Sequence, residues 1–528
     1  MLYTRINVCF EELGPVLLKI LNMSLKLGVF PTQSKTAVVK PSIKDFNEST
    51  DAHSNFRPVS NISYLSKLIE KAVLRQIDNH LSKNNLMCSS QSGYCQYHSC
   101  ETLNIKLFDD MLKSIDEGST VALLLLDMSA AFDTVDHTLL LKQLEEDYGF
   151  SGTVWHWFES YLTSRTCSVN INDAFSNMVC LLFGVPQGSI VGPILFILYT
   201  KHIQHIAQKY GLCIQLYADD TQLYIAFETT NAIDAASCKD NIERCLKEIK
   251  LWMCTKYLKL NEGKTKLLFL CKPLSSKSKH NAEDIQKFSI TTFDTDIEEF
   301  NWVDEKEVKS LGLQLDSELK LDNHIAYLRK FCFGQIMCWK RLGYCLTEDV
   351  KLMLVKQIIL SKLDYNNALL ADLPSYMIQS LQSVINCAIR FIYNVKWRDH
   401  ISPYIVKSHI LPVQYRIDFK ICVLVFNCLH QLAPVYLQNL LVWNIPSLPA
   451  LPSVSINSAP RSTQDPSLLI VPNDFGNRTK YRSRTFSHYA PRVWNKLPYK
   501  VRTSQGKENF KTELKTYFFN LYTSNLSQ

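Results

Sequence analysis

Two adjacent aspartates between two β-prone runs constrain this chain more than any other feature. The segment Cys213–Phe227 carries Asp219 and Asp220 near its middle, with aromatic and branched residues on both sides. This pattern predicts a β-hairpin with the acids at its bend. Two ionised carboxylates side by side repel each other, and a divalent cation would neutralise that repulsion. A solvated Asp-Asp turn is the ordinary alternative, and the hairpin alone does not decide between the two.

A third carboxylate follows a second β-type segment. The apolar run Val121–Leu126 predicts a buried central strand, and Asp127 comes directly after it. A carboxylate at the end of a buried strand is costly unless it is paired or binds a metal. We therefore expect Asp127 to be a third ligand beside Asp219 and Asp220. Oxygen ligands favour Mg²⁺ or Mn²⁺ over zinc.

Two loops carry further candidate residues. In the segment Asn55–Ser60 and the helix expected after it, Arg57 and Lys67 are candidates for binding phosphate, although an arginine beside a proline is more often a solvated surface residue. The segment Gly184–Pro193 predicts a sharp loop with an approachable backbone that leads into one apolar helix from Ile194 to about residue 207. Ordinary turn chemistry is the alternative for this loop.

A helix is predicted to start at Ser99. It lacks a full capping box, because Thr102 stands where Glu or Gln is usual.

Helical patterns dominate the second half of the chain. Helices are expected from Leu321 to Tyr393 and again over 397–443. The stretch from Ile445 to about 474 is rich in proline and serine, which is typical of a linker.

Composition narrows the class of protein. A chain of 528 residues with 46% hydrophobic and 20% charged residues indicates a globular protein of two or more domains. Its apolar runs fall short of the roughly 18–20 residues that span a bilayer, so no membrane partner is expected. The 17 cysteines lack paired metal-type spacing and indicate free thiols, so we expect an intracellular protein, in the nucleus or the cytoplasm.

The net charge of +7 is concentrated near the C-terminus. Residues 475–507 hold nine basic residues and no acidic residue. The basic residues alternate with aromatic ones, so this tail could bind RNA by stacking bases and contacting phosphates. Its candidates are Arg482, Arg484, Arg492 and Trp494. Equally, the aromatic residues could pack against the preceding helices while the charges face water.

Seven motifs in a fixed order resemble the reverse transcriptases of non-long-terminal-repeat (LINE-type, jockey-like) retrotransposons. They are LKLGVFPTQSKTAVVKP, NFRPVSNISYLSKLIEK, LLLLDMSAAFDTVDH, GVPQGSIVGPILFILY, YADDTQLY, LKLNEGKTK and VKSLGLQLD. They cover about residues 20–330, and the tail sequence RTFSHYAPRVWNKLP matches more loosely. Each motif alone is a modest signal, and their order makes the resemblance specific.

The resemblance implies an α+β fold, the right-hand polymerase, with fingers, a palm built on an antiparallel sheet, a helical thumb and a mainly helical C-terminal region. The expected boundaries are 1–120 for an N-terminal helix and the fingers, 121–320 for the palm with part of the fingers interleaved, 321–396 for the thumb, 397–444 for the helical C-terminal region, 445–474 for the linker and 475–528 for the basic aromatic tail.

The activity implied by the resemblance is RNA-directed DNA polymerisation with an RNA template, a DNA primer and deoxynucleoside triphosphates (dNTPs). In that family the residues matching Asp127, Asp219 and Asp220 hold two Mg²⁺ or Mn²⁺ ions. The other family roles fall on Lys264 as proton donor to pyrophosphate, Arg57 and Lys67 as triphosphate ligands, Phe132 as the aromatic gate against a ribose 2′-hydroxyl, Gln187 and Gly188 in the nucleotide pocket, and Leu311 and Gly312 in the primer grip.

Some positions depart from the family pattern. Gly93-Tyr94-Cys95 replaces the usual Gly-Phe-Arg, which removes an expected template contact. The endonuclease that normally precedes the polymerase has no room ahead of residue 20, so we expect a truncated or captured copy of an element. A catalytically inactive nucleic-acid-binding remnant is the alternative function. An RNA-templated RNA polymerase is disfavoured, because Phe132 stands where a small residue would admit ribonucleotides.

Overall fold

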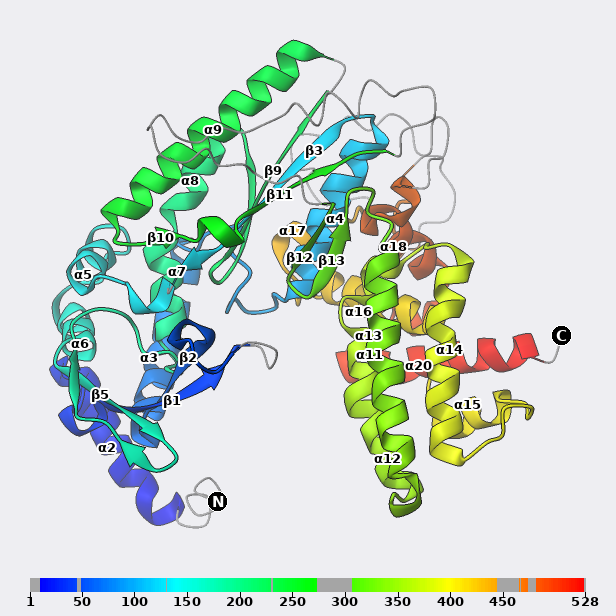
Figure 1. Cartoon of the computed structure of the whole chain (residues 1–528), viewed down its shortest axis with the longest axis horizontal. Helices are drawn as coiled ribbons and strands as arrows, with labels where there is room; N and C mark the ends of the chain where they lie inside the picture. The colour runs from blue at the N-terminus through cyan, green and yellow to red at the C-terminus, as the bar shows by residue number, and fades with distance from the viewer. Residues whose placement is uncertain are drawn as a thin grey trace.

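The structure is a computed structural model that describes residues 10–44, 49–129, 131–228, 231–272, 306–443, 465, 467–472 and 481–526. Two main β-sheets lie in the N-terminal part, and the C-terminal part is helical (Figure 1). The predicted combination of helix and antiparallel sheet is therefore confirmed. None of the helices in the described ranges is both long and apolar enough to cross a membrane.

The central sheet has four antiparallel strands in the order β11 (Lys266–Leu270), β3 (Thr120–Leu126), β9 (Asp220–Phe227) and β8 (Cys213–Tyr217). Successive residues of β3 enter two different cores: Val121 and Leu123 pack on one face, Ala122 and Leu124 on the other. Both faces of the strand are therefore buried, which is why β3 is apolar throughout instead of alternating. The prediction of a buried central strand is confirmed.

Helices cover both faces of this sheet. On one face lie α4 (Cys100–Asp116) and the C-terminal helices, and on the other lie α7 (Gly192–Thr200), α8 (His202–Lys209) and α9 (Ala232–Thr255). The single apolar helix predicted from Ile194 onward is in fact two helices, which meet at Lys201.

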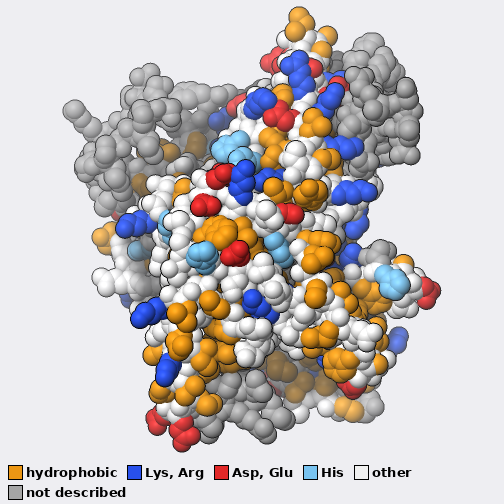
Figure 2. Space-filling view, turned by 90° about the vertical axis from the view of Figure 1, so that its left-hand side faces the viewer, with side chains coloured by type: hydrophobic (Ala, Val, Ile, Leu, Met, Phe, Trp, Pro, Cys, Tyr) orange, Lys and Arg blue, Asp and Glu red, His pale blue; other side chains and the backbone are white. Residues whose placement is uncertain are grey.

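The second sheet lies closer to the N-terminus. Its order is β2 (Phe56–Asn61), β1 (Thr36–Ile43), β5 (Arg165–Ile171) and β6 (Ala174–Phe175), with β7 (Val179–Leu181) also paired to β5. Around it lie α2 (Phe10–Leu27), α3 (Tyr64–Lys83), α5 (His137–Glu146) and α6 (Gly152–Leu162). Figure 2 shows the side of the molecule that is on the left in Figure 1, with hydrophobic side chains gathered in its lower part. On α2 the side chains of Leu13, Val16 and Leu18 are exposed.

The C-terminal helices form one continuous core. They are α11 (Asp322–Arg341), α12 (Glu348–Leu354), the π-helical turn Val355–Leu360, α13 (Ser361–Asp364), α14 (Ser375–Tyr393), α15 (Ser402–Ser408), α16 (Val413–Leu429), α17 (Val435–Gln438), α18 (Phe486–Asn495), α19 (Tyr499–Arg502) and α20 (Lys507–Leu526). The short hairpin of β12 (Glu307–Ser310) and β13 (Leu313–Asp316) joins this helical part to the central sheet.

Two local predictions need correction. A capping box is present at α4, because the Thr102 hydroxyl accepts a hydrogen bond from the Ser99 N–H at 2.9 Å, as a Glu or Gln side chain would. Most of the predicted linker 445–474 lies outside the described residues. Its described end is not a free linker, since Leu469 is buried and forms a β-bridge with Trp443.

Candidate active site

The predicted hairpin bend with two acids is confirmed. Strands β8 and β9 pair up to Tyr217 and Asp220, which leaves Ala218 and Asp219 as the two-residue turn. Ala218 has φ of +58°, in the left-handed region that two-residue hairpin turns use. The turn therefore places Asp219 and Asp220 at one end of the central sheet.

A neighbouring loop fixes this turn in place. The Gln91 side-chain oxygen accepts hydrogen bonds from the N–H groups of Gly93 at 2.7 Å and Ala218 at 3.0 Å. A Cβ atom built on Gly93 would lie 2.3 Å from the nitrogen of Ala218, so only glycine allows this approach. The loop that departs from the family pattern at Tyr94 and Cys95 thus still supports the acid-bearing turn.

Asp127 is held by a residue that the sequence analysis did not single out. The side-chain amide of Asn261 donates a hydrogen bond to the Asp127 carboxylate at 2.9 Å, and the Asn261 N–H donates to the Asp127 carbonyl at 2.8 Å. The short pairing of β10 (Lys259–Leu260) with β4 (Met128–Ser129) brings the two residues together. Asn261 belongs to the quoted motif LKLNEGKTK, but its sequence position alone gives no partner.

Four predicted site residues line one pocket of about 240 Å³: Asp127, Asp220, Lys264 and Leu311. Lys266 and Lys309 also line it, so the pocket combines two carboxylates with three lysines. The residues lie in or next to β3, β9 and β11 of the central sheet and in the separate hairpin of β12 and β13, so only the tertiary structure brings them together. Such a lining suits chemistry on phosphate groups, since lysine binds phosphate as a compact point charge.

Burial and neighbouring negative charges raise the pKa values of Asp219 and Asp220. Burial raises the pKa of Asp220 to about 6; the negative charges of Asp219 and Asp127 add to this shift, and the positive charge of Arg57 opposes it. The pKa of Asp219 is also raised, chiefly by burial, with a further contribution from Asp127. Each shift reflects mainly the cost of ionising a buried carboxyl, and the neighbouring acids add to that cost.

The donor set fits a divalent cation in its chemistry. Carboxylate oxygens are what Mg²⁺ and Mn²⁺ prefer, and a cation would remove the repulsion that raises both pKa values. The described residues nevertheless contain no cluster of three acidic, histidine or cysteine side chains arranged to hold a metal ion. Asp219 does not line the pocket that Asp127 and Asp220 share.

The loop 184–191 packs closely against two other elements. A Cβ atom built on Gly188, which has φ of +114°, would lie 2.6 Å from the carbonyl oxygen of Ser60 in β2. The Gln187 amide group donates to both carboxylate oxygens of Asp133, at 2.9 and 2.8 Å. The loop backbone is therefore closely approached, as predicted, but its neighbour is another segment of the same chain, at Ser60. A role of Gln187 and Gly188 toward a nucleotide stays a prediction.

Phe132 lies beside this loop. Its ring stacks on Phe196 of α7 with ring centroids 4.7 Å apart, and its carbonyl accepts a hydrogen bond from the Val185 N–H at 2.8 Å. The ring is therefore fixed in position while part of it stays exposed. That arrangement is compatible with a rigid wall of a substrate pocket.

A buried glutamate, Glu70 of α3, anchors the end of the same loop. Its carboxylate accepts hydrogen bonds from the N–H groups of Ile190 at 2.6 Å and Val191 at 3.2 Å, and from the Ser66 hydroxyl at 2.8 Å. Sequence reasoning missed it, although a glutamate one position after the core residue Ile69 on the buried face of a helix is itself a signal.

The two predicted phosphate ligands lie in the second sheet and its neighbouring helix. Arg57 is exposed on β2, and its charge reaches the acid pair, as the pKa values of Asp219 and Asp220 show. Lys67 is half-buried in the first turns of α3. A contact between Lys67 and a triphosphate stays a prediction.

Leu311 and Gly312 form the turn between β12 and β13, with φ of +43° and +78°. The Tyr365 hydroxyl donates a hydrogen bond to the Leu311 carbonyl at 2.8 Å, and a Cβ atom on Gly312 would lie 2.9 Å from the Tyr365 ring. The side chain of Gln222 in β9 donates to the Ser310 hydroxyl at 2.6 Å. The turn is therefore fixed between the central sheet and the helical part.

The predicted tail contacts are wrong for two residues. Trp494 has no exposed surface, and its indole N–H donates to the Ser467 carbonyl at 2.7 Å. The guanidinium group of Arg484 is enclosed by protein and donates to the Leu319 carbonyl at 2.8 Å. Neither side chain can reach an RNA, because both are packed between helices. Arg482 is exposed and Arg492 half-buried, so their predicted contacts remain untested.

Comparison with known proteins gives the family. Residues 40–315, just over half of the chain, match the family described as "Reverse transcriptase (RNA-dependent DNA polymerase)". The chain belongs to the reverse transcriptase family. Among its relatives is the "Probable RNA-directed DNA polymerase from transposon BS" of Drosophila melanogaster, 26% identical over 323 residues, which are 60% of this chain and 33% of that protein.

Two further relatives also come from transposons. They are the "Probable RNA-directed DNA polymerase from transposon X-element" of Drosophila melanogaster, 24% identical over 72% of this chain and 40% of that protein, and the "RNA-directed DNA polymerase from mobile element jockey" of Drosophila funebris, 25% identical over 47% of this chain and 27% of that protein. The predicted resemblance to jockey-like reverse transcriptases is confirmed. This chain spans well under half the length of these relatives.

Among solved structures, apo telomerase from Candida tropicalis matches 71% of this chain and 59% of its own chain, with a TM-score of 0.40 and 13% identity. Telomerase from Candida albicans with a fragment of telomeric RNA matches 74% and 65%, with a TM-score of 0.37 and 14% identity.

Proposed function

We propose that this protein is an RNA-directed DNA polymerase that transfers nucleotides from dNTPs to the 3′-hydroxyl of a primer annealed to an RNA template. The observation that carries the proposal is the shared pocket of Asp127, Asp220 and Lys264 in a chain of the reverse transcriptase family. In this proposal the central sheet is the palm, the second sheet with α3 belongs to the fingers, and the helices from α11 to α14 are the thumb.

The acids and basic residues have separate roles in the proposal. Asp127, Asp219 and Asp220 would hold Mg²⁺ or Mn²⁺, which supplies charge stabilisation for phosphoryl transfer and lowers the pKa of the attacking hydroxyl. Lys264 lies in the same pocket and would donate a proton to the departing pyrophosphate. Arg57, whose charge reaches the acids, would bind the triphosphate.

Selection of the sugar is assigned to Phe132. Its stacking on Phe196 limits the ring's freedom to move aside, so a ribose 2′-hydroxyl would meet a fixed surface. The hydrogen bond between Gln187 and Asp133 and the close approach of Gly188 to Ser60 fix the neighbouring loop. Such a site would favour deoxynucleotides because it would exclude a ribose 2′-hydroxyl.

Primer extension tests the proposal. The full chain is incubated with a homopolymer RNA, an annealed DNA primer, Mg²⁺ or Mn²⁺ and labelled dNTPs, and extension is compared with that of Asp219→Ala and Asp220→Asn. Both substitutions should abolish extension. The matched control is Asp240→Asn, since Asp240 is an exposed residue of α9 that pairs only with the nearby Arg244.

A folded wild-type protein that binds the hybrid but extends no primer would refute the proposal and favour the inactive remnant. Extension that survives in both aspartate variants would show that these acids do not hold the catalytic metal.

A further inference from the structure

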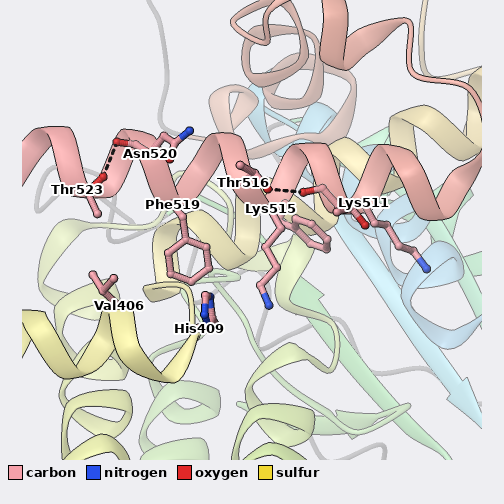
Figure 3. A pocket seen from close by; sticks show the side chains of 10 residues that line it. Val406, His409, Lys511, Lys515, Thr516, Phe519, Asn520 and Thr523 are labelled. Atoms are coloured by element: carbon pink, nitrogen blue, oxygen red, sulfur yellow. Dashed lines mark hydrogen bonds between the residues drawn. The ribbon is translucent and has the colours of Figure 1, made fainter.

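A second and larger pocket lies in the helical C-terminal part. It has a volume of about 490 Å³, against about 240 Å³ for the pocket at the acids, and the two pockets share no lining residue. Its walls are α20 on one side and α15, His409 and Phe419 on the other. Figure 3 shows Phe519 and Lys515 pointing from α20 toward Val406 and His409.

The pocket is positively charged. Lys511 and Lys515 line it, and no carboxylate is present among the described lining residues. Lys511 pairs with Glu508 at 2.7 Å, but Glu508 is largely exposed, so this pair is weak. The pKa of Lys515 is lowered by burial and by the nearby charges of Lys356 and Arg416, although Arg416 is itself paired with Asp364.

The rest of the lining is aromatic or hydroxylated. The Phe519 ring stands edge-on to His409 with ring centroids 5.8 Å apart, and the Lys515 ammonium lies 5.8 Å from the Phe519 centroid. Thr512 and Thr516 also line the pocket; their hydroxyls donate to helix carbonyls at 2.9 Å each, which leaves each oxygen able to accept a further hydrogen bond.

We propose that this pocket binds single-stranded RNA, with a nucleobase against Phe519 and phosphate groups at Lys511 and Lys515. Aromatic rings beside cations are the usual means of holding unpaired nucleotides. A concave site of this volume takes one or two splayed nucleotides, whereas a duplex presents a broad convex surface. The threonine oxygens can accept a hydrogen bond from a ribose 2′-hydroxyl, which favours RNA over DNA.

The inference goes beyond the proposed polymerase site, because it places a second RNA contact on α20, outside the pocket at the acids. It does not require that site to be active. An RNA longer than the copied segment could bind both sites at once, so the pocket would retain the template near the enzyme.

Fluorescence anisotropy with a labelled ten-nucleotide polyuridine RNA tests the inference. The full chain is titrated at several salt concentrations with an excess of unlabelled blunt-ended RNA–DNA hybrid, which has no unpaired RNA and occupies the polymerase site. The double variant Lys511→Gln/Lys515→Gln should weaken binding about tenfold. Two lost phosphate contacts should reduce the slope of log affinity against log salt by about 1.4.

The matched control is Lys19→Gln/Lys26→Gln, which removes the same charge from exposed positions on α2 and should leave binding unchanged. Phe519→Leu keeps an apolar side chain but removes the ring, so it should weaken RNA binding without changing the salt slope. Thermal melting confirms that each variant is folded.

Three outcomes of the titrations with the variants and with DNA would overturn the inference. They are unchanged RNA affinity in the folded lysine variant, equal loss in the α2 control, and binding of the matching DNA as tight as that of RNA. Displacement of the RNA by an equal concentration of polyglutamate would also overturn it, because the pocket would then accept an acidic peptide. Failure of primer extension alongside lysine-dependent RNA binding would refute the polymerase and leave this inference standing.

Discussion

Replacing Glu70 with glutamine should loosen the loop 184–191. Glu70 has no exposed surface, and its carboxylate accepts hydrogen bonds from the N–H groups of Ile190 and Val191 and from the Ser66 hydroxyl. These two N–H groups lie at the start of α7, where a helix favours negative charge. The substitution removes that charge and keeps the shape of the side chain.

The magnitude follows from the hydrogen bonds. A bond to a charged group contributes about 1.5–3 kcal/mol and a neutral one about 0.5–1.5 kcal/mol. Glutamine can keep its oxygen toward the two backbone N–H groups and its amide toward Ser66, so Glu70→Gln loses the charge assistance of all three bonds. We expect a loss of about 3–4 kcal/mol in the free energy of unfolding. Glu70→Ala also leaves both N–H groups without a partner and should cost about 3–6 kcal/mol.

Urea unfolding followed by tryptophan fluorescence measures these losses. Glu145→Gln is the control, since Glu145 is an exposed residue of α5 and should change stability by less than about 0.5 kcal/mol. Because the loop carries Gln187 and Gly188, Glu70→Gln should also raise the KM for dNTPs in primer extension.

A Glu70→Gln protein as stable as the wild type, or more stable, would refute this reasoning. It would show that the cost of burying the charge exceeds the gain from charged hydrogen bonds.

Three further substitutions test other contacts. Gly312→Ala forces a methyl group against a neighbouring ring at positive φ and should lower the free energy of unfolding by about 1–3 kcal/mol. Gly334→Ala in α11 meets open space and should raise the free energy of unfolding by about 0.5–1 kcal/mol. Equal urea midpoints for the two variants would contradict this. Asn261→Ala frees the Asp127 carboxylate and should lower the kcat of primer extension about tenfold with little change in melting temperature, and an unchanged kcat would exclude a positioning role. Burial raises the pKa of Asp418 to about 6, so the folded protein binds that proton more tightly than the unfolded chain and loses stability as pH rises from about 4 to about 6. Asp418→Asn avoids that loss. The free energy of unfolding of the variant should therefore rise relative to that of the wild type between pH 4 and pH 7. A difference that stays constant over this range would contradict the raised pKa of Asp418.

Much of the secondary structure could be predicted because its determinants are local. The apolar run of β3, the turn between β8 and β9 and the start of α4 at Ser99 each depend on residues a few positions apart. The capping box was missed because the prediction allowed only Glu or Gln at its last position, although the threonine hydroxyl at Thr102 accepts the same hydrogen bond.

The contacts that build the site could not be predicted in this way. Asn261 donates a hydrogen bond to Asp127, more than a hundred residues away in the sequence. Gln187 donates to Asp133 because its loop packs against the turn after β3. A sequence shows that these side chains can form hydrogen bonds, but it does not show which partner lies within 3 Å.

The sequence by itself indicated the family, many of the strands and helices and three candidate acids, because motifs and periodicity are properties of short segments. Only the tertiary structure decided which aromatic side chains of the basic tail are available to a nucleic acid. Alternating aromatic and basic residues suit both a solvated RNA-binding arm and a packed helix. The rings of Trp494 and Phe510 are buried, since long-range contacts remove them from water.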